Sequence, residues 1–142
     1  MAIHKFMQDQ INYVFDDCKI IKLYKNGKII ELERDSKEFS QIMDIWQMTL
    51  KNSYEMPSLG VSLDSETRQA IQHGLFIEFV FDKTNCHNDM PFDSILVEIV
   101  ENQGGYQLQR NFENQYQGRC YYLNIFEINN DLYDFVNNIE KN

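Results

Sequence analysis

The side chains best suited to metal chemistry lie in residues 82–89, which read DKTNCHND. Cysteine, imidazole and carboxylate groups are all good ligands for Zn²⁺. Cys86 and His87, however, are adjacent and would point apart in an extended chain, and no C-x-x-C or H-x-x-x-H spacing supports them. A set of four ligands would need distant help, for example from His73 or Cys120. We therefore expect an exposed hairpin loop here, and neither a metal ion nor another cofactor.

A cysteine nucleophile would need a base such as histidine within hydrogen-bond reach. Cys86 could meet His73 or His4 after folding, but no spacing in the sequence brings them together. Cys18 and Cys120 lie among apolar residues, where a free cysteine behaves as a small hydrophobic side chain. We expect no catalytic thiol.

Two carboxylates could do acid–base work if they shared a cleft, with one of them in an apolar environment. Glu78 and Glu98 are the candidates, because each lies among apolar neighbours in a segment that alternates as a strand does. If the two segments pair, both side chains can share one face of the sheet. A small enzyme or ligand-binding protein with a cavity near Glu78, His73 and Cys86 is therefore an alternative hypothesis, although two solvent-facing strand residues are the simpler interpretation.

Motifs for other chemistries are absent. Gly104-Gly105 has no following Lys-Ser or Lys-Thr and precedes a strand instead of a helix, so it does not resemble a phosphate-binding loop. The chain contains no G-x-S-x-G, H-E-x-x-H or EF-hand pattern. The sequence leaves enzymatic activity open but favours a protein without catalytic residues.

The elements that must position these residues follow from hydrophobic spacing. Residues 3–17 have helical spacing, and β-rich segments at 19–24 and 28–33 flank Asn26-Gly27, a pair suited to a type I′ hairpin turn. A helix follows with Phe39, Ile42, Met43, Trp46 and Leu50 on one stripe, widened by Ile45 and Met48. We expect residues 51–63, with Pro57 and Gly60, to be irregular, and a short helix to run from about 64 to 73.

The second half of the chain predicts a sheet. Segments 75–82 and 95–100 alternate with one wholly apolar face, and residues 83–93 between them predict a long loop. Segments 106–112 and 119–126 add two strands, and Asn129 or Asn130 can cap a final helix. The expected fold is α+β: a mainly antiparallel sheet of about six strands with helices packed on one face, in a single domain over residues 1–142.

Charge separates the two halves of the chain. The whole chain has a formal net charge of −9, and residues 75–142 carry −7 of it, with 4 basic against 11 acidic side chains. A surface of that sign repels phosphate, which disfavours direct binding to nucleic acid and to anionic membranes. It attracts basic proteins. Three widely spaced cysteines do not form a disulfide framework, and no signal peptide or apolar run of about 20 residues is evident, so we expect a cytoplasmic location.

The leading hypothesis is a non-catalytic acidic module that binds a basic protein. An inhibitor or antidote that neutralises a nuclease or another nucleic-acid-binding protein would have this character. Aromatic residues gather in the last hairpin, and exposed tyrosines beside acids make good protein contacts. The predicted binding residues are Glu98, Glu101, Glu113, Tyr116 and Tyr122. A homodimer or other oligomerising structural role is a third hypothesis, since the strands of residues 75–100 carry apolar residues on both faces.

Overall fold

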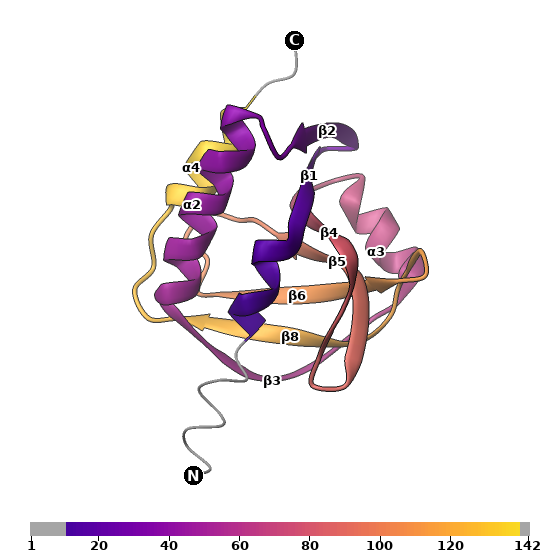
Figure 1. Ribbon diagram of the computed structural model, residues 1–142. Helices are drawn as coiled ribbons and strands as arrows, with labels where there is room; N and C mark the ends of the chain where they lie inside the picture. The colour runs from indigo at the N-terminus through magenta and orange to yellow at the C-terminus, as the bar shows by residue number, and fades with distance from the viewer. Residues whose placement is uncertain (1–10, 140–142) are drawn as a thin grey trace.

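The computed structural model describes residues 11–139, which form a curved antiparallel sheet with helices on both faces (Figure 1). Within this range there are four helices and eight strands. The helices are η1 (Ile11–Asp17, a 3₁₀ helix), α2 (Lys37–Lys51), α3 (Asp64–Ile71) and α4 (Asp131–Asn137). The strands are β1 (Cys18–Lys25), β2 (Lys28–Glu33), β3 (Ser53–Ser62), β4 (Leu75–His87), β5 (Met90–Glu98), β6 (Gly105–Phe112), β7 (Gln115–Tyr116) and β8 (Gly118–Ile125).

The strands follow the order β2-β1-β4-β5-β6-β8-β3, and β7 pairs beside them with β6. Every pairing is antiparallel. The α+β class and the antiparallel sheet are thus confirmed, but the described residues form eight strands instead of about six. α2 touches both edge strands, β2 and β3, because the sheet curves around this helix.

The two faces of the sheet are covered by different helices. Leu23 and Ile77 belong to the main core with η1, α2 and α4, whereas Tyr24 and Phe76, one residue away along each strand, form a smaller cluster with Ile71 of α3. Strand side chains alternate between faces, so α3 lies on the face opposite α2. The expectation that all helices pack on one face is therefore wrong for α3.

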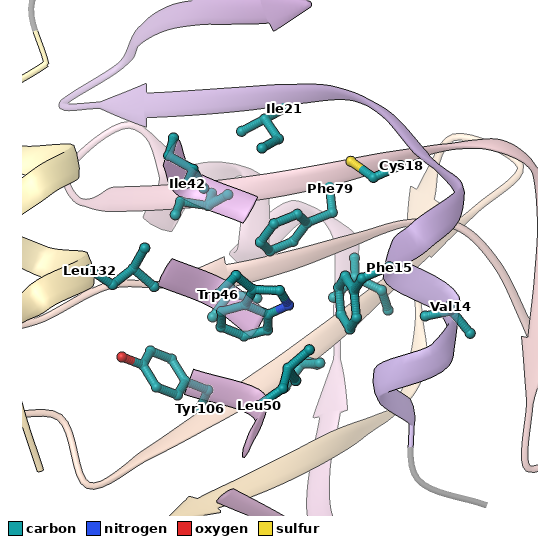
Figure 2. Close-up of a cluster of buried hydrophobic side chains, with 14 of the residues drawn as sticks. Val14, Phe15, Cys18, Ile21, Ile42, Trp46, Leu50, Phe79, Tyr106 and Leu132 are labelled. Carbon is teal, nitrogen blue, oxygen red and sulfur yellow. The ribbon is translucent and has the colours of Figure 1, made fainter. Parts of the chain in front are cut away.

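Trp46 of α2 lies at the centre of the main core (Figure 2). The centre of its ring lies 5.0 Å from the ring centre of Phe79, 5.4 Å from that of Phe15 and 5.6 Å from that of Tyr106. The buried stripe of α2 is the one that helical spacing predicts, and the Ser36 hydroxyl caps the helix by accepting a hydrogen bond from the Phe39 amide. α2 is 15 residues long; among residues 11–139, no helix combines the length and apolar character needed to cross a bilayer.

The first hairpin forms as its turn residues predict. β1 and β2 pair from Ile20–Glu33 to Lys25–Lys28, and Asn26 and Gly27 have φ of 51° and 86°. Positive φ at both central residues is the requirement of a type I′ turn. Of the helix expected over residues 3–17, the part from 11 to 17 is the 3₁₀ helix η1, and residues 3–10 lie outside the described range.

Two segments expected to be irregular are strands. Residues 53–62 form β3, where Pro57 is tolerated because β3 is an edge strand and its register shifts between Pro57 and Val61. The predicted loop 83–93 is instead the far part of the β4–β5 hairpin, closed at Asn88 and Asp89 with φ of 53° and 63°. The hairpin extends past the part of the sheet that α3 covers, so its residues are polar. For this reason the sequence does not indicate the pairing.

Candidate functional site

α2 and α4 lie side by side on one side of the molecule (Figure 1). A groove runs between the side chains of these two helices. It consists of two adjoining hollows of about 400 and 650 Å³, which share Ile45 and Asp131 as lining residues. Each helix presents to it the residues beside its own buried stripe, which in α4 consists of Leu132 and Val136. We call this surface the α2–α4 groove.

Acidic side chains line the α2–α4 groove, and no lysine or arginine of residues 11–139 does. The five carboxylates are those of Glu38, Asp44, Glu127, Asp131 and Asp134. All five residues are exposed. Among the described residues, the ion pairs are Arg68–Asp64 and His87–Glu55, so none of the groove carboxylates has a cationic partner there. The groove therefore concentrates negative charge that the described part of the chain does not neutralise.

The floor of the α2–α4 groove is partly apolar. Ile45 and Met48 of α2 face it, together with Phe135 of α4 and Ile139 just after that helix. Met48 is 64% exposed, which is unusual for a large apolar side chain on an otherwise well-packed helix. The sequence carried a signal for this surface, because Ile45 and Met48 lie beside the main stripe of α2. Sequence reasoning assigned them to the core and missed the groove.

Three of the predicted binding residues lie near one end of the sheet. Gln107 pairs with Tyr122, and continuing the β5–β6 register places Glu98 on the other side of Gln107. Glu98 and Tyr122 are thus two strands apart on the face that carries α3, roughly 10 Å at the usual strand spacing. Glu98 is exposed, Tyr122 is half-buried, and the exposed Glu101 follows in the turn after β5.

The other two predicted binding residues lie elsewhere. Glu113 is exposed in the turn between β6 and β7, at the opposite end of β6. Tyr116 is only 3% exposed, because its ring packs in the cluster beneath α3 and its hydroxyl points inward to Glu78. The five residues therefore do not form one surface, and Tyr116 does not present its ring to solvent.

Glu78 is buried, with only 4% of its surface exposed. Its carboxylate accepts hydrogen bonds from the Tyr24 hydroxyl at 2.7 Å, from the Tyr116 hydroxyl at 2.9 Å and from the Ser94 hydroxyl. Burial, reinforced by the nearby Glu78 charge, raises the pKa of both tyrosines. Glu98 lies on the same face but is exposed, so the two carboxylates occupy different environments. Glu78 lines neither hollow of the α2–α4 groove, and hydroxyl groups already occupy its oxygens.

Arg68 of α3 covers this buried carboxylate from above. Its guanidinium lies 5.1 Å from the centre of the Tyr116 ring and donates to Asp64 at 2.9 Å and to the Asn114 carbonyl at 2.8 Å. The hydrogen bond from Arg68 lowers the pKa of Asp64. These contacts hold α3 against the sheet. The surroundings of Glu78 therefore stabilise the fold and do not open its carboxylate to solvent.

His87 forms a second polar cluster at the far end of the β4–β5 hairpin. The ring is buried, and its Nε2 lies 3.0 Å from each carboxylate oxygen of Glu55, while its Nδ1 lies 3.1 Å from the Tyr13 hydroxyl. Neither His73 nor Cys120 joins it. Within the described residues, no three histidine, cysteine or acidic side chains are grouped as a metal ion would require.

The cysteine thiols differ in accessibility. Cys18 and Cys120 are buried, and burial raises the pKa of Cys18 to about 12 and also raises that of Cys120. Cys86 is exposed, and its neighbour His87 points into the protein towards Glu55. No described histidine forms a hydrogen bond with any of the three thiols.

Comparisons with protein-family models, curated proteins and solved structures found no match to this chain.

Proposed function

We propose that the protein is a non-catalytic binding module whose α2–α4 groove receives a basic, partly apolar segment of another protein. The observation that carries the proposal is five carboxylates that have no cationic partner among residues 11–139, around a floor of apolar side chains. Lysine and arginine side chains of a partner would supply the missing counter-charges, and a buried apolar anchor would cover Ile45 and Met48. Charge of one sign around a partner site also speeds its encounter with the opposite charge.

Part of this acidity has a second explanation. Glu38, Asp131 and Asp134 lie in the first turns of α2 and α4, where a carboxylate stabilises the helix through its dipole. Asp44 lies in the middle of α2 and Glu127 lies before α4, so helix dipoles do not account for them. Asp44 and Glu127 are therefore the residues that separate a binding role from a helix-stabilising one.

The segment that fits best is an amphipathic helix with lysines on one side and leucines on the other. Helix-in-groove recognition places apolar residues at i, i+3, i+4 and i+7 into an apolar floor. The groove offers floor contacts from Ile45 and Met48 of α2 and from Phe135 of α4, with acidic residues along both helices. A peptide with charge but no apolar face would meet the carboxylates and leave the floor uncovered.

The test uses the full chain and a designed amphipathic Lys/Leu peptide as the probe. Titration followed by NMR should shift the methyl resonances of Ile45 and Met48, and binding should weaken as salt is added. The double variant Asp44→Lys/Glu127→Lys should weaken binding at low salt by at least about tenfold, since each exposed charge contact is worth about 1 kcal/mol. A Lys/Ser peptide of equal charge should bind more weakly than the Lys/Leu peptide.

The matched control is Glu101→Lys/Glu113→Lys. It makes the same change in net charge, from −9 to −5 by four units, on two residues that the sequence predicted and that lie outside the groove. If both double variants weaken binding equally, only overall charge matters and the groove is not the site. If the methyl resonances of Ile45 and Met48 do not shift, the groove is likewise not the site.

The narrower role that we propose is that of an inhibitor or antidote of a nuclease or another nucleic-acid-binding protein. A row of carboxylates offers such a partner the charge that phosphates offer it. In that case, nucleic acid should compete with this protein for its partner, while this protein alone should not bind nucleic acid. A basic partner whose binding nucleic acid leaves unchanged would remove this narrower role and keep the broader one.

A further inference from the structure

Tyr13, His87 and Glu55 form a continuous chain of hydrogen bonds between η1, β4 and β3. The Tyr13 hydroxyl lies 3.1 Å from His87 Nδ1, and His87 Nε2 lies 3.0 Å from both oxygens of Glu55. We propose that this chain activates the Tyr13 hydroxyl as a nucleophile and makes Tyr13 a site of acylation by activated esters. A hydroxyl beside an imidazole that a carboxylate orients is the general arrangement of an activated nucleophile.

The imidazole is held in place on both sides. The side chain of His87 is 1% exposed, and its ring packs against that of Tyr121 with centres 5.0 Å apart. The Tyr121 hydroxyl donates to the His87 carbonyl at 2.7 Å, and Glu55 is fixed in turn by the Ile11 amide at 2.8 Å. A ring fixed in this way loses little entropy when it accepts a proton, which is what a general base requires.

The cluster can hold a proton at either end without losing a hydrogen bond. When the Nε2 hydrogen of His87 donates to Glu55, Nδ1 is free to accept the hydroxyl hydrogen of Tyr13. When Nδ1 has taken that hydrogen, it donates to the phenolate oxygen of Tyr13, while Nε2 still donates to Glu55. The proton can therefore move from Tyr13 to His87 without leaving a buried group unsatisfied.

Among residues 11–139, few other charged side chains lie beside His87. The titratable groups that face it are Glu55 from β3, Tyr13 from η1 and Tyr121 from β8, with Cys86 next along the chain. The positive charge of the Arg110 guanidinium on β6 favours the deprotonated form of Tyr121, and the guanidinium donates hydrogen bonds to backbone carbonyls. Glu55 is thus the one carboxylate in hydrogen-bond contact with the ring among the described residues, and its charge stabilises the imidazolium that forms when His87 takes the proton.

Accessibility distinguishes Tyr13 from the buried tyrosines. Tyr13 is 52% exposed, whereas Tyr106, Tyr116 and Tyr121 are at most 5% exposed. An ester carbonyl in solvent can therefore approach Tyr13 but not the buried phenols. Tyr54 is the useful comparison, because it is 37% exposed and its hydroxyl accepts from Asn124 and bonds to no described histidine.

The reaction with a p-nitrophenyl ester balances as follows. The Tyr13 oxygen forms a bond to the acyl carbon, and the bond from that carbon to the nitrophenyl oxygen breaks. The phenolic proton passes to His87 Nδ1, and p-nitrophenolate leaves as the anion. The imidazolium then returns its proton to solvent.

The experiment treats the full chain with limiting p-nitrophenyl acetate and measures acetylation of each tyrosine by peptide mass spectrometry. Tyr13 should be labelled at least about tenfold faster than Tyr54, which is below the roughly 10²–10⁴-fold effect of a general base in an enzyme. His87→Gln should bring the ratio close to one, and Glu55→Gln should lower it in part. Tyr54→Phe should leave labelling of Tyr13 unchanged.

Equal labelling of Tyr13 and Tyr54, or a ratio that His87→Gln does not change, would overturn the proposal. If His87→Gln does not fold by circular dichroism, the wild-type pH profile decides. Labelling of Tyr13 relative to Tyr54 should then fall towards acidic pH, because the transfer needs a base that can accept the proton, and identical pH profiles for the two tyrosines would contradict the proposal.

Discussion

The Tyr116 hydroxyl donates a hydrogen bond of 2.9 Å to the Glu78 carboxylate and so connects the two-residue strand β7 to the middle of β4. Tyr24 donates to the same carboxylate oxygen at 2.7 Å, and the Ser94 hydroxyl donates to the other. A buried carboxylate with three hydroxyl donors is satisfied only while all of them stay in place. This arrangement explains why a tyrosine in a turn-rich segment of the sequence is not on the surface.

We expect Tyr116→Phe to lower the free energy of unfolding by about 1.5–3 kcal/mol, the usual range for a hydrogen bond to a charged group. The ring would stay in place while Glu78 loses one donor. Urea denaturation followed by circular dichroism measures the change. Glu98→Gln is the control, because this exposed residue lies on the same face of the sheet, and it should change stability by less than about 0.5 kcal/mol. Equal effects of the two substitutions would contradict the account of Glu78.

Stability should fall at alkaline pH. Burial raises the pKa of Tyr106 to about 12 from 10.0, and that of Cys18 to about 12 from 9.0. Since the folded state keeps these protons longer than the unfolded state, their contribution is complete below about pH 9 and is lost as the pH rises towards 12. By about pH 11, Tyr106 should cost about 1 kcal/mol and Cys18 roughly twice as much.

Tyr106→Phe isolates one part of this alkaline loss. The Tyr106 hydroxyl has no hydrogen-bond partner among residues 11–139, so its removal should change stability little at pH 7. The variant should lose less stability than the wild type between about pH 9 and pH 11, as measured by urea midpoints at each pH. Parallel pH profiles for the two proteins would show that Tyr106 does not contribute.

Trp46→Phe should destabilise the protein much less than Trp46→Ala. The indole Nε1 of Trp46 is buried without a hydrogen-bond partner in the described part of the chain, and it points towards the Phe15 ring (Figure 2). Removing this nitrogen relieves an unsatisfied donor worth about 1–3 kcal/mol, which offsets part of the lost packing. Trp46→Ala should cost about 3–5 kcal/mol, as usual for a large buried ring. Urea denaturation followed by circular dichroism measures both changes in the free energy of unfolding. Similar changes for the two substitutions would show that the unpaired nitrogen does not destabilise the protein.

Neutralising the two groove acids that helix dipoles do not explain should stabilise the free protein. Asp44→Asn with Glu127→Gln removes like-charge repulsion along the α2–α4 groove and should raise the free energy of unfolding by a few tenths of a kcal/mol at low salt. Added salt should stabilise the wild type more than this variant, because salt screens the same repulsion. Denaturation at low and high salt measures both effects, and an equal salt response would indicate that the groove charges do not interact.

Local signals in the sequence correctly predicted the elements that depend on residues close together in the chain. Asn26 and Gly27 set the first hairpin through their backbone angles, and the stripe through Phe39 and Trp46 set α2. These features depend on residues close in the chain, so periodicity and turn chemistry predict them.

The remaining features depend on partners distant in the chain. Pro57 argued against a strand, but at the sheet edge the missing N–H is tolerated, and the edge position follows only from pairing with β8. Tyr116 was expected near the surface because nothing close in sequence indicates that Glu78, 38 residues away, receives its hydroxyl. Tyr13, Glu55 and His87 come from three separate segments, and no spacing between them signals that they meet.

The pairing of β3 with β8 also has a consequence for how the chain acquires its structure. β3 ends at Ser62 and β8 spans Gly118–Ile125, so during synthesis β3 leaves the ribosome well before its partner strand exists. Contacts so distant in the chain slow folding, and an unpaired strand is exposed to wrong partners while it waits. Pro57 lacks the N–H that continuous strand pairing requires, so it makes premature association of nascent chains through this strand less favourable.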